Sequence, residues 1–281
     1  AGMVQTAEAV STIVSPALAG FLIMTIEIWG VILIDFATFL VALLTLSLVR
    51  VPRPPISAES KREKPSFLNE VTFGWKYIIS RHGLLALLLF FAATNFIFGF
   101  TNVLFTPLIL SFASPIVLGT VISIGGVGML LGGIVMSMWG GPKRRINGIL
   151  GFSLISGAVL AFAGVRESAL LIAVVVFALL FTTPITNGCS QAIWQTKTAP
   201  DVQGRVFSVR RMLAMSVTPL SYVAAGPLAD KIFEPLMAVN GPLAGSMGRI
   251  IGTGPGRGIG LMFVMVGVGT VGITLVSYLY P

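Results

Sequence analysis

Long apolar runs separated by short basic connections constrain the fold of this chain more than any other feature. We read eight runs of roughly 18 to 27 residues, each long enough to cross a hydrocarbon core of about 30 Å as a helix. They cover residues 3–25, 28–49, 84–110, 116–139, 148–165, 168–190, 206–229 and 258–280. The runs are too long for barrel strands and do not alternate polar with apolar residues. The sequence therefore predicts an all-α membrane protein, a polytopic bundle of about eight transmembrane helices.

The composition agrees with a protein in lipid. Of the 281 residues, 55% are hydrophobic and only 10% are charged, against about 25% charged residues in a typical soluble domain. The net charge of +8 would suggest nucleic acid in a soluble protein. Here the basic residues lie in or near the connections, where they set the topology and attract anionic lipid headgroups. We expect membrane lipids as partners and no nucleic acid.

The distribution of Lys and Arg predicts which connections face the cytoplasm. The longest polar stretch, Arg50 to Arg81, is rich in basic residues, and the positive-inside rule places it in the cytoplasm. Alternation then puts residues 140–147 and 191–211 on the same side, and they carry most of the other basic residues. The outer connections hold only Arg166, Lys231, Arg249 and Arg257. This pattern predicts a multi-pass protein of the plasma membrane.

An internal similarity predicts how the spans are grouped. Residues 14–16 (Val-Ser-Pro) in the first span resemble residues 217–219 (Val-Thr-Pro) in the seventh, and the long loop leaves six spans behind it. Paired six-helix halves are the plan of one large transporter class. We therefore expect residues 1–49 to be the last two helices of an N-terminal half, 50–82 a central cytoplasmic loop, and 83–281 a C-terminal six-helix half. Four more helices are expected upstream, which would give twelve in the complete protein.

Several stretches resemble the major facilitator superfamily. Gly132 to Leu150 is similar to the short basic loop after the second helix of each half. Pro200 to Leu213, Ala224 to Pro235 and Gly252 to Gly260 look like the branch that includes macrolide-efflux-like and enterobactin-exporter-like proteins, and Trp29 to Leu44 resembles that branch's sixth helix. The resemblance runs from the fifth to the twelfth family helix. It implies a secondary active transporter, monomeric when complete, that exports amphipathic or hydrophobic small molecules by alternating access and proton antiport.

Polar residues within the spans indicate where a substrate pathway would lie, because they are costly in lipid and tend to face the bundle interior. Thr183, Asn187 and Gln191 recur every four residues and share one helix face. Asn95 and Asn102 lie in the third span. The resemblance identifies these two spans as the tenth and seventh family helices, which border the central cavity. We predict that all five residues line a substrate cavity; the alternative is hydrogen bonding that holds helices together.

Two carboxylates within the spans are candidates for proton coupling. Asp35 lies in the second span, and Glu8 lies about two turns into the first. A carboxylate removed from water holds its proton more tightly and can exchange it near neutral pH, as a proton antiporter requires. The alternatives are a helix–helix hydrogen bond for Asp35 and an interfacial pair with a cytoplasmic Arg for Glu8.

The basic cytoplasmic connections supply the candidates for gating. They are Gly133, Ser137, Gly140, Lys143, Arg144 and Arg145, with Arg205 and Arg210 from the next connection. Glycines at 128 and 132 give the preceding span a flat face that favours close packing. The resembling family usually has an Asp where this chain has Ser137, which puts the gating interaction of that Asp in doubt. The alternative is a topology signal combined with tight packing.

Two segments outside the spans also carry predictions. Residues 66–80 place apolar side chains at helical spacing, which predicts an amphipathic helix on the inner membrane surface. Residues 230–257 are expected to form a flexible or re-entrant outer loop, because its glycines lack the spacing of a nucleotide site.

Enzyme function is not expected. The chain has no G-x-S-x-G, H-E-x-x-H or Walker motif, and it has a single Cys189 and a single His82. We therefore predict no cofactor and no metal site. The alternative to a transporter is a non-transporting membrane scaffold or regulatory module derived from a transporter fold.

Overall fold

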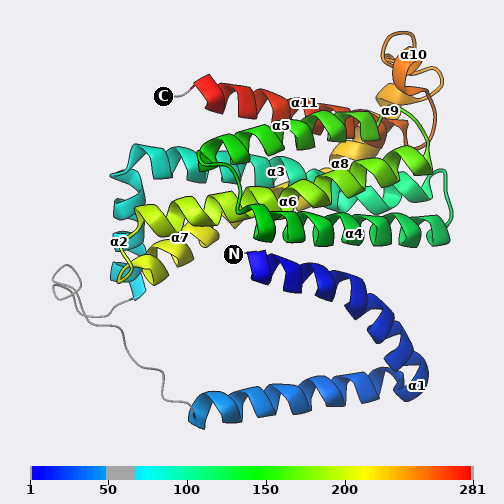
Figure 1. The fold of residues 1–281 in the computed structure, drawn as a ribbon. Coiled ribbons are helices and arrows are strands. Elements are labelled where there is room, and N and C mark those ends of the chain that lie inside the picture. The colour runs from blue at the N-terminus through cyan, green and yellow to red at the C-terminus, as the bar shows by residue number, and fades with distance from the viewer. Residues whose placement is uncertain (1, 49–66, 280–281) are drawn as a thin grey trace.

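The computed structural model describes residues 2–48 and 67–279, and every regular element in these two ranges is helical (Figure 1). The long helices are α1 (Gly2–Leu48), α3 (His82–Leu110), α4 (Pro115–Trp139), α5 (Arg145–Ala163), α6 (Ala169–Lys197) and α11 (Arg257–Leu279). The shorter elements are α2 (Phe67–Ile79), α7 (Gln203–Met215), α8 (Thr218–Leu228), the π-helix η2 (Ala229–Phe233), α9 (Glu234–Met237) and α10 (Gly248–Ile251).

Seven helical segments in the described residues are long and apolar enough to cross a membrane. They match seven of the eight predicted spans, with boundaries that differ by up to eight residues. The remaining span, 3–25, falls in the first part of α1, where most side chains lie outside the described structure. The predicted class, an all-α membrane bundle, is confirmed.

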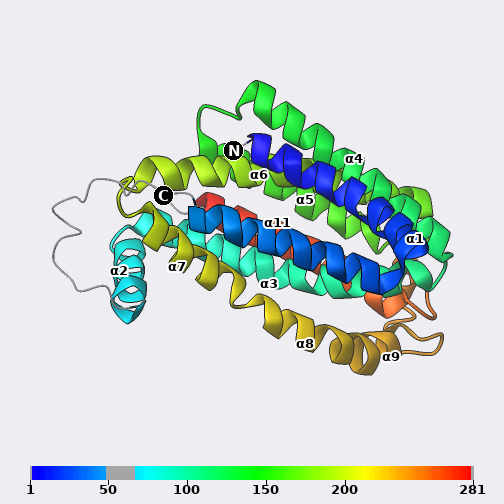
Figure 2. The same cartoon turned by 90° about the horizontal axis from the view of Figure 1, so that it is seen from below.

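The first long helix, α1, is two helices joined at Glu27. The backbone of Glu27 has φ 57° and ψ 178°, which is not helical, and the predicted boundary between the first two spans falls at this position. The first arm packs against α4, whereas the second arm, Trp29–Leu48, turns back and runs alongside the bundle, separated from it in Figure 1; Figure 2 shows the two arms from below. Nearly all of the second arm is exposed, so its apolar surface faces away from the other described helices.

The predicted seventh span is broken rather than continuous. It divides into α7 and α8 around Ser216 and Val217, and it continues through η2 and α9 to Met237. Pro219 stands in the first turn of α8, and because proline has no N–H, it cannot donate to the carbonyl of Met215 one turn earlier. The bend between the two helices is visible in Figure 2.

Glycines let neighbouring helices of the bundle approach until their backbones are in contact. A Cβ atom added to Gly128 or Gly132 of α4 would collide with the backbone of Phe177 or Phe181 in α6. The two backbones therefore touch, as the glycine pattern predicts. A Cβ on Gly157 of α5 would lie 3.0 Å from the carbonyl oxygen of Gly267 in α11.

The amphipathic helix α2 packs into the protein rather than lying only on a surface. Its Ile78 is fully buried among residues of α3, α6 and α7. The Tyr77 hydroxyl donates to the carbonyl of Lys197 at 3.3 Å, and Glu70 forms an ion pair with Arg205 of α7 at 3.5 Å. The expected helix is present, but one of its faces is part of the core.

The connection from η2 to α11 is a folded cap instead of the flexible or re-entrant loop that we expected. Its short helices α9 and α10 bring Met237 and Ile251 against Leu261, and all three side chains are buried. Gly252, Gly254 and Gly256 take positive φ angles of 95°, 118° and 78°, which glycine adopts without strain. The glycines therefore serve the turns of a compact cap.

Candidate functional site

A cavity of about 470 Å³ lies between α3, α4, α5 and α6. Its apolar wall includes the aromatic rings of Phe90, Phe91, Phe98 and Phe105 from α3. The polar side chains that line it in the described part of the chain are all neutral: Thr94, Asn95, Thr101, Asn102, Ser153, Ser156, Thr182, Thr183, Thr186 and Asn187. An apolar cavity with a few hydrogen-bonding groups is the usual character of a small-molecule site.

The cavity leads from the surface of the bundle into its interior. Asn102 and Asn187 are exposed, whereas Ser153, Ser156 and Thr182 are buried. Ser156 and Thr182 share a hydrogen bond of 2.7 Å between α5 and α6. The inner part of the cavity therefore lies within this group of helices.

Four of the five predicted cavity residues line this space. Asn95, Asn102, Thr183 and Asn187 are all in its wall, although their role in substrate binding stays a prediction. Gln191 lies outside the lining, where its side-chain oxygen accepts a hydrogen bond from Arg210 at 3.1 Å. Asn187 thus lines the cavity, whereas Gln191, one turn further along α6, contacts helix α7.

Asn95 also has a clear structural role. Its amide nitrogen donates to the carbonyl oxygen of Ala214 at 2.9 Å, next to the break between α7 and α8. Neighbouring side chains commonly satisfy the carbonyls that a broken membrane helix leaves free. This contact corresponds to the helix-joining alternative stated for the polar residues.

The two hydroxyls that α5 contributes to the cavity are not among the residues that the sequence predicts for it. Ser153 and Ser156 lie three residues apart in the apolar part of α5, and both line the cavity. The rule that selected the asparagines applies to serine as well, but a serine hydroxyl is a weaker signal because it can bond to its own helix backbone.

Asp35, one of the two candidates for proton coupling, does not line this cavity. Asp35 is exposed on the second arm of α1, in a shallow depression shared with Ile32, Phe36, Thr38, Phe39 and Ala42. The Thr38 hydroxyl donates to the backbone carbonyl of Asp35 at 2.9 Å. The side chain of Glu8 lies outside the described residues. Both assignments stay predictions.

The gating candidates Gly140, Lys143, Arg144 and Arg145 lie at the tight turn between α4 and α5. Gly140 ends α4 in a left-handed conformation with φ 71°, and the Arg145 guanidinium donates to its carbonyl. Lys143 and Arg144 are exposed. The Ser137 hydroxyl donates to the carbonyl of Gly133 at 2.8 Å, so it bonds within its own helix.

The other two gating candidates lie elsewhere. Arg205 pairs with Glu70 of α2. Arg210 donates to the Ser190 hydroxyl and the Gln191 side-chain oxygen, both at 3.1 Å, and its guanidinium carbon lies 4.9 Å from the centre of the Trp194 ring. The predicted gating residues are thus divided among the end of α4, the α4–α5 turn, the α2–α7 contact and the α6–α7 contact.

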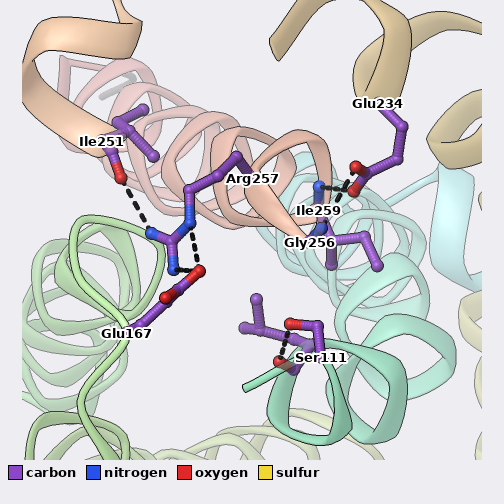
Figure 3. A network of polar contacts seen from close by, with 8 residues as sticks. Ser111, Glu167, Glu234, Ile251, Gly256, Arg257 and Ile259 are labelled. Atoms are coloured by element: carbon purple, nitrogen blue, oxygen red, sulfur yellow. Dashed lines mark hydrogen bonds and ion pairs between the residues drawn. The ribbon is translucent and has the colours of Figure 1, made fainter. Parts of the chain in front are cut away.

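A polar network ties the predicted outer ends of the helices together (Figure 3). The buried Arg257 forms an ion pair with Glu167 and donates to the carbonyl of Ile251 at 2.8 Å. Glu234 accepts hydrogen bonds from the backbone N–H groups of Gly256 and Ile259, both at 3.1 Å. A carboxylate is favourable at this place because the start of a helix has free N–H donors and a positive dipole end.

These features define a multi-pass α-helical membrane protein whose helices enclose a neutral, partly polar cavity. The chain belongs to the Major Facilitator Superfamily, because the sequence model of that family matches residues 1–221.

Curated relatives support the same family. The chain is 30% identical over 237 residues to a Streptococcus pyogenes protein named macrolide efflux protein A. The aligned residues make up 83% of this chain and 58% of the relative. This chain is also 30% identical over 225 residues to the Enterococcus faecalis protein of that name. That alignment covers 78% of this chain and 69% of the relative. The chain thus spans little more than half of the first relative's length. No solved structure matches the chain significantly.

Proposed function

We propose that this chain is part of a secondary active exporter that moves amphipathic or hydrophobic small molecules, macrolides among them, out across the plasma membrane. The single observation that carries the proposal is the membrane-spanning bundle with a 470 Å³ cavity of aromatic and neutral polar residues in a chain of this family. The relatives' name, macrolide efflux protein A, supports macrolides as the substrate class. Residues 83–281 would form one six-helix half, and residues 1–49 the end of the other.

Transport by alternating access requires the two halves to move as units around a central site. The backbone contact between α4 and α6 at Gly128 and Gly132 and the Arg210 bonds between α7 and α6 support a C-terminal half that moves as one body. We propose that the α4–α5 turn and Arg210 act at its cytoplasmic end during gating.

Accumulation of a labelled macrolide tests the proposal. The complete protein would be produced in a bacterium that lacks its own efflux pumps, and intracellular radiolabelled erythromycin would be measured. We expect lower accumulation than in cells with an empty vector, and a protonophore should remove the difference if proton antiport drives export. Equal accumulation with and without the protein would contradict export of macrolides and favour the scaffold alternative, which Ser137 in place of the usual family Asp also suggests.

Asp35→Asn tests proton coupling separately. The change removes the exchangeable proton while keeping the shape of the side chain, so accumulation should return to the empty-vector level with equal protein in the membrane. Asp230→Asn is the matched control, because Asp230 is also exposed but lies in η2, beyond α8. Full export by Asp35→Asn would exclude Asp35 from the mechanism.

A further inference from the structure

The cavity contains two kinds of polar group, which differ in whether their hydrogen bonds are already made. Thr94 donates to the carbonyls of Phe90 and Phe91 at 2.9 and 3.1 Å. Thr183 donates to the carbonyl of Leu179 at 2.8 Å. The remaining members of this first kind, each bonded to another protein group, are Asn95, Asn102, Ser156, Thr182 and Thr186.

Thr101, Ser153 and Asn187 form the second kind. The Thr101 hydroxyl oxygen is buried and has no hydrogen-bond partner. Ser153 is only 8% exposed, and within the described helices no hydrogen bond joins its hydroxyl, or the Asn187 amide, to another residue. Serine and threonine in membrane helices usually bond to a carbonyl one turn earlier, as the first kind does. Ser153 and Asn187 keep their donors and acceptors available to the cavity, whereas the Thr101 oxygen is covered and reaches the cavity only when the side chain turns about its Cα–Cβ bond.

Leaving such groups unbonded is unfavourable. A buried donor or acceptor without a partner loses the hydrogen bonds that it makes in water, and Thr101 and Ser153 come from two different helices, α3 and α5. A bound molecule that supplies oxygen atoms would remove this cost. A charged group would find no counter-charge among the described residues that line the cavity, because all of them are neutral.

We propose that Thr101, Ser153 and Asn187 determine specificity by hydrogen bonding to the neutral, oxygen-bearing part of the substrate, while the phenylalanines of α3 contact its apolar part. The ligand class is a lipophilic molecule rich in hydroxyl, carbonyl or ether oxygens. Any cationic group on the substrate would be recognised outside this cavity. This inference rests on the proposed export function and extends it to named contacts.

Binding to the purified complete protein tests the inference with two probes. Erythromycin is a lipophile with many hydroxyl and carbonyl oxygens, whereas tetraphenylphosphonium is a lipophilic cation without oxygen. The variants are Thr101→Val, Ser153→Ala and Asn187→Leu, which remove hydrogen bonding with little change in size. Because one hydrogen bond contributes about 1 kcal/mol, each should weaken erythromycin binding about fivefold to tenfold and leave tetraphenylphosphonium binding unchanged.

Thr120→Val and Ser277→Ala are the matched controls, since both hydroxyls bond to their own helices and neither residue lines the cavity. They should retain erythromycin binding within about twofold. If all five variants bind erythromycin like the wild type, or if the three lose affinity for both probes equally, the inference is wrong while export stands. If the wild type neither binds nor exports erythromycin, the proposed function fails first and the inference with it.

Discussion

Arg257 and Glu167 form an ion pair that joins the start of α11 to the connection between α5 and α6. Nη2 and Nε of Arg257 lie 2.5 and 2.8 Å from the same carboxylate oxygen of Glu167. The two partners differ in burial: the Arg257 side chain is 5% exposed and that of Glu167 is 45% exposed. Water can therefore solvate the carboxylate if the pair is broken, but it cannot solvate the guanidinium.

This difference predicts the effect of removing each charge. Glu167→Gln leaves a buried cation without a counter-charge, which is the more costly loss, so it should lower the melting temperature of the protein in detergent. Arg257→Met should lower it as well, because the carbonyl of Ile251 also loses its donor. In the double variant no uncompensated charge remains, and the total decrease should be smaller than the sum of the two single decreases. Additive decreases would show that the pair contributes nothing to stability.

Asn95→Leu should loosen the break between α7 and α8. The Ala214 carbonyl would lose the amide that bonds to it, at a cost of about 1–2 kcal/mol. Hydrogen–deuterium exchange should become faster around Met215 to Ser221 and stay unchanged in α5. Asn102→Leu is the control, because the Asn102 amide bonds only to Phe98 of its own helix. Unchanged exchange in Asn95→Leu would show that the break does not depend on this bond.

The contact between α4 and α6 should not tolerate added side chains. Gly132→Ala places a methyl group against the backbone of Phe181, and overpacking of this kind typically costs about 1–3 kcal/mol. Gly119→Ala is the matched control in the same helix, because no atom lies within 4 Å of its added Cβ. The melting temperature should fall for Gly132→Ala alone. An equal effect at both positions would contradict close packing and indicate a general effect on helix α4.

The helices and part of the cavity could be predicted from the sequence because lipid makes the rules strict. Each span must be long, apolar and helical, and so its position is visible in the residue order. Asparagine is rare enough in lipid to mark the cavity, which is why the sequence predicts Asn102 and Asn187 as lining residues. The sequence does not predict Ser153 as a lining residue, since a serine hydroxyl in a helix usually bonds to the backbone. Only the structure shows that this hydroxyl does not.

Long-range pairing explains what could not be predicted. The sequence places Glu167, Glu234 and Arg257 in outer connections, but it does not indicate that Glu167 pairs with Arg257 or that Glu234 accepts from the backbone at the start of α11. The same holds for Gln191, which follows the cavity stripe in the sequence but bonds to Arg210. The glycines of 252–256 suggested flexibility, whereas the structure uses them for turns that bury Ile251.

Cysteine labelling tests the predicted sidedness of the helices. The native Cys189 is buried and would be replaced by Ala, and Lys143→Cys and Arg249→Cys would be made one at a time at these exposed positions. Because basic residues remain in the cytoplasm, a membrane-impermeant maleimide should label Arg249→Cys in intact cells and Lys143→Cys only after the cells are opened. Arg166→Cys and Arg211→Cys provide a second pair with the same expectation. If Lys143→Cys reacts in intact cells as fast as Arg249→Cys, the α4–α5 turn is not cytoplasmic, and the sidedness predicted from the basic residues is wrong.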